Sequence, residues 1–117
     1  MKNLTAQQVR ELYIEYALTA ENAMANNDYK TNNKAANQLT KIFKVCEKDI
    51  DLAKEILMPL LEHENFSVKA NAAADCLRLG ICIKSAEEVL EKMSKEKGII
   101  GFNAEICLGL WQKGELK

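Results

Sequence analysis

Apolar side chains recur at steps of three and four residues along most of this chain, which is the spacing of one face of an α-helix. The first such stripe starts at Val9 and predicts a long first helix. Thr5 and Gln8 form a capping box at its start, and Asn26-Asn27-Asp28 ends it and can cap the next helix. A second stripe predicts a helix over about residues 29–48.

The middle of the chain predicts two further helices. Residues 49–51 can cap a third helix, and Pro59 should kink it or split off its last turn, because proline lacks a backbone donor. Ser67 is expected to cap a fourth helix that ends at Gly80 in the αL conformation. The alanines of this fourth helix permit close contact with a neighbouring helix.

The last third of the chain predicts helices five and six. Ser85 and Glu88 form a second capping box, which opens a helix that runs to Gly98. Helix six should begin near Gly101-Phe102 and bury a stripe made of Phe102, Ile106, Cys107, Leu110 and Trp111. Residues 81–83 could instead be a short extended piece, although no second strand exists to pair with it.

Six helices joined by short loops predict an all-α fold of stacked antiparallel pairs, namely helices one and two, three and four, five and six. Each pair has roughly 35 to 45 residues, the size of a two-helix solenoid repeat. We expect one domain over residues 1–117, with a closed six-helix bundle as the alternative. Most aromatic residues occupy stripe positions and should pack in the core, with Trp111 as an exception that closes the last repeat or anchors a partner.

Two segments carry a family resemblance. Leu60-Leu61-Glu62-His63-Glu64-Asn65-Phe66-Ser67-Val68-Lys69, followed by an Ala-rich stretch that ends Leu77-Arg78-Leu79-Gly80, resembles a HEAT repeat, with Lys69 where that pattern usually has arginine. Residues 86–116 look like the end of a family of small bacterial HEAT-like domains of unknown function. The resemblance implies an armadillo-type α-α superhelix without a known active site. It also implies small proteins of the kind that act as immunity proteins beside polymorphic or contact-dependent growth-inhibition toxins.

Composition narrows the class of protein. With 48% hydrophobic and 28% charged residues and one proline in 117, the chain has the composition of a folded protein. No apolar run reaches the roughly 18 to 20 residues of a membrane span, and no signal-peptide core follows Met1, so we expect a cytoplasmic protein without membrane contact. The four cysteines form no Cys-x-x-Cys pair and should be buried thiols.

We expect a protein that is not an enzyme and holds no metal or cofactor. His63, the single histidine, has no cysteine or second histidine at ligand spacing. The carboxylates at Glu11 and Glu15, and those around Glu88, lack the Glu-x-x-His motif of a di-metal bundle and fit ordinary exposed helix surfaces. Gly98-Ile99-Ile100-Gly101 is typical of a turn between helices rather than of a phosphate-binding loop.

Two adjacent segments carry opposite charge. Residues 29–48 contain five lysines against one glutamate, and at about 100° per residue these lysines fall within roughly 80° of arc. We call them the lysine ridge: Lys30, Lys34, Lys41, Lys44 and Lys48. Residues 49–64 contain one lysine and five acidic residues, which we call the acidic segment: Asp49, Asp51, Glu55, Glu62 and Glu64. A solvated helix face is the simplest interpretation of each set.

The function that we expect is a protein-binding module, most concretely an immunity protein that binds and masks a cognate toxin. If that toxin is a nuclease, the acidic segment could enter its basic cleft as a phosphate mimic. One alternative is a nucleic-acid-binding helical repeat that uses the lysine ridge. The net charge of −1, the presence of only two arginines and the lack of aromatics among the lysines disfavour it. The other alternative is a general interaction scaffold.

Overall fold

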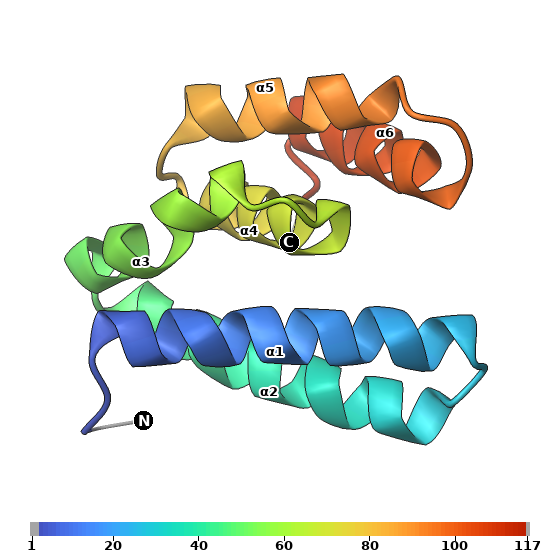
Figure 1. Ribbon diagram of the computed structural model, residues 1–117. Coiled ribbons are helices and arrows are strands. Elements are labelled where there is room, and N and C mark those ends of the chain that lie inside the picture. Colours follow the sequence, from blue (N-terminus) through green and yellow to red (C-terminus); the bar gives the residue numbers. More distant parts are fainter. Residues whose placement is uncertain (1–2, 117) are drawn as a thin grey trace. The chain divides into compact units, whose positions relative to one another are not determined.

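The computed structural model describes residues 3–116, which contain helices and turns and no strand. The elements are α1 (Ala6–Ala25), α2 (Tyr29–Lys48), α3 (Ile50–Leu57), the short 3₁₀ helix η1 (Met58–Glu62), α4 (Phe66–Leu79), α5 (Ile83–Ser94) and α6 (Ile99–Gln112) (Figure 1). The predicted all-α fold with six helices is confirmed. The chain divides into two compact units, Met1–Ile56 and Leu57–Lys117, so the expectation of a single domain stays a prediction.

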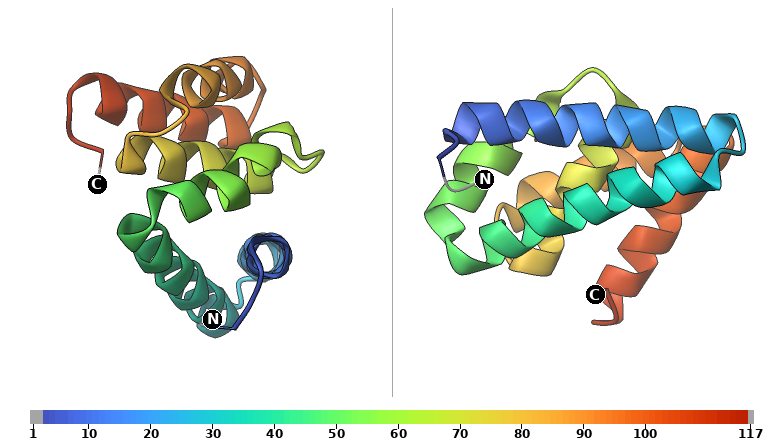
Figure 2. Two further views of the ribbon diagram at one scale, coloured as in Figure 1. Left: turned by 90° about the vertical axis from the view of Figure 1, so that its left-hand side faces the viewer. Right: turned by 90° about the horizontal axis from the view of Figure 1, so that it is seen from below.

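The first unit is built on an antiparallel hairpin of α1 and α2, which lie side by side in Figures 1 and 2. The predicted capping box is confirmed, because the Thr5 hydroxyl accepts from the Gln8 amide at 3.1 Å and the Gln8 side chain accepts from the Thr5 amide at 2.9 Å. Tyr13 and Ile42 are buried within this unit. Burial of one stripe from each helix is the main apolar contribution to its stability.

Helix α3 is joined to α1 by an arginine. Nη2 of Arg10 donates to the backbone carbonyl oxygen of Glu55 at 2.6 Å. This carbonyl lies in the last turn of α3, where a helix has unpaired acceptors and a partial negative charge, so a cation there stabilises the helix end. At the other end of α3, the predicted cap is confirmed, since the Asp49 carboxylate accepts from the Leu52 amide at 3.1 Å.

Pro59 ends the α-helical geometry of the third predicted helix. The chain passes at Met58 from α3 into η1, with the proline in the first turn of the 3₁₀ helix. This is the predicted separation of the last turn, because a proline in the helix interior removes one hydrogen bond and clashes with the preceding turn.

In the second unit, η1, α5 and α6 all pack against α4, and helices that follow one another along the chain run in opposite directions (Figure 1). The buried face of α4 consists of Val68, Ala72, Ala73, Cys76 and Leu77. The small side chains at its centre allow close helix approach, as the sequence predicted. Gly80 ends α4 with φ of 72°, which confirms the predicted αL residue.

Three predicted helix starts are wrong. Asn65, not Ser67, caps α4, because its side chain accepts from the Val68 amide at 3.0 Å. Helix α5 begins at Ile83, directly after Cys82 with φ of 48°, and ends at Ser94, so Ser85 and Glu88 form no capping box. Helix α6 begins at Ile99. Each helix begins one or more residues before its predicted start.

The buried face of α6 also differs from the prediction. Its buried residues are Gly101, Ala104 and Leu108, whereas Phe102 and Ile106 are 62% and 45% exposed. Because apolar residues occur on several sides of α6, residue spacing alone could not identify the inward face. The aromatic prediction is likewise wrong at Tyr29, which is 61% exposed.

The inward face of α6 depends on a close approach at Gly101. A Cβ atom at this position would overlap the carbonyl oxygen of Glu96 and lie 2.8 Å from its carbonyl carbon. Both are backbone atoms and cannot rotate away. Gly101 therefore sets how closely α6 approaches the end of α5.

We predict that Gly101→Ala lowers the free energy of unfolding by about 1–3 kcal/mol, the usual cost of overpacking. Gly109 provides a matched control on the same helix, because nothing lies within 4 Å of its Cβ position. Gly109→Ala should raise stability by up to about 1 kcal/mol through helix propensity. Urea unfolding followed by circular dichroism measures both. Equal effects of the two substitutions would contradict the close approach at Gly101.

Candidate functional site

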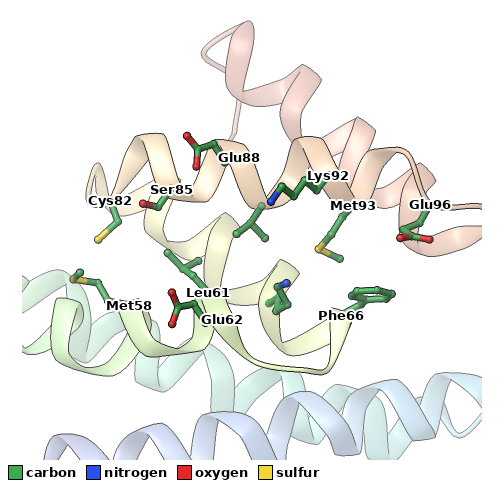
Figure 3. Close-up of a pocket in the computed structure, with 12 residues that line it drawn as sticks. Met58, Leu61, Glu62, Phe66, Cys82, Ser85, Glu88, Lys92, Met93 and Glu96 are labelled. Atoms are coloured by element: carbon green, nitrogen blue, oxygen red, sulfur yellow. The ribbon is translucent and has the colours of Figure 1, made fainter.

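A groove of about 670 Å³ in the second unit runs between α5 and a wall formed by η1 and the start of α4 (Figure 3). Its α5 side is lined at helical steps from Cys82 to Glu96. The 12 residues of α5 have a length of about 18 Å at 1.5 Å per residue. The groove therefore follows the whole of α5 and is elongated.

The floor of the groove is apolar, and apolar side chains also form part of one wall. Leu61 and Met93 are buried, and the side chain of Met93 points from α5 towards Phe66 (Figure 3). Met58 is 51% exposed and Phe66 is exposed. Methionine is flexible and polarizable, so a surface that contains two methionines can adapt to different apolar side chains.

Charged side chains line the opening of the groove. They are Glu62, Glu88 and Glu96, together with Lys69 and Lys92. Among residues 3–116, none of these five forms an ion pair. Their charges are therefore available to a bound molecule, and the Glu62 carboxylate points from η1 towards α5 (Figure 3).

The predicted acidic segment is divided between the two units. Asp49, Asp51 and Glu55 belong to the first unit, and Glu62 and Glu64 belong to the second. All five are exposed. Asp49 already caps α3, and of the five only Glu62 lines the groove. No single unit therefore holds the whole predicted set.

The predicted lysine ridge lies entirely on α2, and all five of its lysines are exposed. Lys34, Lys41 and Lys44 line a second hollow, between α1 and α2, of about 670 Å³. Tyr16 of α1 lines the same hollow. Along α2, no aromatic residue shares the helix face of the lysines, and Tyr16 comes from the neighbouring helix.

The groups with metal-binding or nucleophilic chemistry are scattered. His63 Nδ1 accepts from the Asn65 amide at 3.0 Å in the turn before α4. Cys46 and Cys76 are buried, whereas Cys82 and Cys107 are half-buried, and burial raises the pKa of the Cys107 thiol. Within residues 3–116, no group of three or more His, Cys, Asp or Glu side chains is arranged to hold a metal ion. In the same part of the chain, no helix is both long and apolar enough to cross a membrane.

Trp111 does not stand free at the end of the chain. Its Nε1 donates to the Glu87 carboxylate at 3.0 Å and so ties the last turn of α6 to α5. The groove residues Met58, Phe66 and Met93 were not predicted as a site. Met58 and Phe66 are exposed and Met93 is buried, and no periodicity marks which apolar residue lines a groove.

Comparison with known proteins gives one family. The sequence profile of a family described as "Domain of unknown function (DUF2019)" matches residues 7–110. No curated protein and no solved structure matches the chain. The match covers helices of both units.

The N-cap of α2 contributes to the stability of the fold, and this contribution depends on pH. The Asp28 carboxylate accepts from the Thr31 hydroxyl at 2.6 Å and from the Thr31 amide at 3.1 Å. These hydrogen bonds, that of the side chain first, lower the pKa of Asp28 below its ordinary value. A carboxyl with a lowered pKa in the folded state contributes stability that is present at neutral pH and is lost as the pH falls through that pKa.

We predict that the melting temperature falls on acidification from about pH 5 to pH 2, partly through Asp28. Asp28→Asn should flatten this part of the profile, because asparagine caps a helix without titrating. Thr31→Val removes the hydroxyl donor and should shift the transition to higher pH. Thermal unfolding by circular dichroism at each pH tests this. Parallel profiles for the wild type and the Asp28→Asn variant would contradict it.

Proposed function

We propose that this chain, which belongs to the DUF2019 family, is a non-enzymatic protein-binding module that holds its partner in the groove of its second unit. The observation that carries the proposal is the groove itself. It combines an apolar floor, a length of several helical turns and charged side chains without ion-pair partners among the described residues. An elongated groove of this kind suits a helix or an extended segment of another protein.

The chemistry of the groove resembles that of the central part of a protein interface. Apolar anchors contribute most of the affinity when they fill a desolvated centre, and charged groups around them set orientation and specificity. Met58, Leu61 and Phe66 supply one wall of that centre. Glu62 and Lys92 can pair with opposite charges on the partner at the rim.

The resemblance of residues 60–80 to a HEAT repeat supports the same function. This segment forms η1 and α4, and it supplies Leu61, Glu62, Phe66 and Lys69 to the groove. In helical repeats, stacked helices provide a rigid, extended surface, and a rigid surface loses little conformational entropy on binding. We propose that the whole chain is HEAT-like.

The most concrete form of the proposal is a cytoplasmic immunity protein that masks a cognate toxin. Inhibition by masking needs a large complementary surface and no catalytic residue. If the toxin is a nuclease, acidic side chains can occupy the site of the nucleic-acid backbone. Glu62, which lines the groove, is our candidate for this role in the second unit, and Asp51 and Glu55 are the exposed candidates in the first unit.

We predict that the Met58→Lys variant loses at least about tenfold in affinity for the toxin, which corresponds to about 1.4 kcal/mol. The assay expresses a toxic neighbouring gene product with and without this chain, then measures growth and the affinity of the purified pair. Met24→Lys is the matched control, because Met24 is 53% exposed and Met58 is 51% exposed, and Met24 lies in the first unit.

The same assay distinguishes between binding in the groove, the phosphate-mimic role and the immunity role. Protection that survives Met58→Lys and Phe66→Glu would contradict binding in the groove. Unchanged affinity after joint reversal of Asp51 and Glu55, and after Glu62→Lys, would contradict the phosphate-mimic role but leave binding in the groove intact. If no product of a neighbouring gene is toxic and bound, the immunity role is wrong.

A second candidate function, binding to nucleic acid, is favoured by the hollow between α1 and α2. Three ridge lysines line one concave surface together with Tyr16, one carboxylate, Glu15, and hydroxyl and amide side chains. Lysines that track a phosphate backbone beside an aromatic ring are typical of single-strand binding. The net charge of −1 opposes it at long range.

If the chain binds nucleic acid, Lys34→Ala with Lys41→Ala should weaken binding and lower the dependence of log affinity on log salt by roughly 0.7 per lost phosphate contact on a single strand. Fluorescence anisotropy with labelled single-stranded oligonucleotides measures both quantities. Lys54→Ala, on α3 and away from the ridge, is the control. Absence of binding at low salt would rule this function out.

A further inference from the structure

Helix α6 presents an apolar stripe that nothing in its own unit covers. Ile99, Phe102 and Ile106 are 76%, 62% and 45% exposed, and we call them the α6 stripe. At about 100° per residue they fall within roughly 60° of arc, so they form one continuous row along the helix. None of them lines the groove beside α5. A helix that is apolar on its outer as well as its inner face is usually buried on both.

The α6 stripe carries no charge that would select a charged partner. Glu105 is the only charged residue between Ile99 and Gln112, and it lies about 60° outside the stripe by the same helical geometry. Leu110 continues the row towards the C-terminal end and is half-buried. The surface best matched to such a row is another uncharged apolar row.

A gap on the same face of α6, which we call the notch, makes the α6 stripe of one copy complementary to that of a second copy. Gly109 lies in α6 with open space around its Cβ position. It follows Ile99, the most exposed residue of the stripe, by ten positions, or about 15 Å of helix. When two copies of α6 cross in opposite directions, with the two-fold axis level with residue 104, Ile99 of each copy meets Gly109 of the other. Phe102 of each then faces Ile106 of the other.

We propose that a second copy of this chain covers the α6 stripe and that the protein forms a two-fold symmetric dimer through antiparallel α6 helices. In such an isologous contact, one self-complementary patch serves both copies. The proposal is independent of the partner of the groove, because it uses a different helix and needs no second protein.

The size of the patch sets the strength of the dimer. Three exposed side chains on one 14-residue helix provide less area than the roughly 1,200–2,000 Å² of a stable interface. The dimer is therefore weak and depends on concentration. It forms at high local concentration and dissociates on dilution.

The first measurement is sedimentation equilibrium of the purified chain over a range from low micromolar to near millimolar concentration. The mass should rise from 13.2 kDa towards that of a dimer. Phe102→Lys and Ile106→Glu should each raise the dissociation constant at least about tenfold. Both residues are exposed, so circular dichroism should show folded variants. Gly109→Leu fills the notch and should weaken association as well. Tyr29→Lys is the control, because Tyr29 is 61% exposed in the other unit.

A mixture of two variants tests the antiparallel pairing itself. When the Phe102→Lys variant is mixed with the Ile106→Glu variant, the new lysine of one copy faces the new glutamate of the other, and the second contact keeps its native pair. The mixture should therefore associate more tightly than either variant alone. A parallel arrangement, or association through another surface, gives no such recovery.

Two outcomes would overturn the proposal. The first is a wild-type chain that stays monomeric at every concentration. The second is an association that Phe102→Lys, Ile106→Glu and Gly109→Leu leave unchanged. If these substitutions break the association and mixing the variants does not restore it, the antiparallel pairing is wrong.

Discussion

Helix α4 has alanine or cysteine at several of its most buried positions, and this lets η1, α5 and α6 all pack against it. Ala72, Ala73 and Cys76 are completely covered, which means that three neighbours approach one helix closely. Small side chains at such positions bring helix axes together and leave the larger residues to fill the periphery. The groove beside α5 follows from this arrangement, because α4 holds η1 and α5 while a gap stays open between their outer faces.

Close packing at a small residue also determines how α5 and α6 are arranged. Gly101 lets the start of α6 press against the carbonyl groups that end α5, and Trp111 ties its last turn to Glu87. With both ends held, α6 cannot rotate to bury the row that contains Phe102. The second unit therefore exposes apolar side chains along the groove and along the α6 stripe. Exposed apolar rows of this kind favour association with other protein surfaces.

The lysine ridge and the acidic segment show which groups of charged residues can be predicted from their spacing along the chain. The lysine ridge forms as predicted, because its five lysines share one helix face and a helix keeps its periodicity. The acidic segment is divided between the two units, because the chain divides after Ile56. Residues on one helix can be grouped from sequence alone. Residues on both sides of a bend cannot.

The class of fold, the number of helices and most of the C-terminal helix ends could be predicted from the sequence, because these depend on local interactions. Side-chain caps such as Thr5, the αL glycine at position 80 and the break at Pro59 act within a few residues. Tertiary packing was needed to show which face of α6 is buried and that Met58 and Phe66 border a groove. Those outcomes depend on contacts between segments far apart in the chain, where several apolar faces compete for burial and packing selects one.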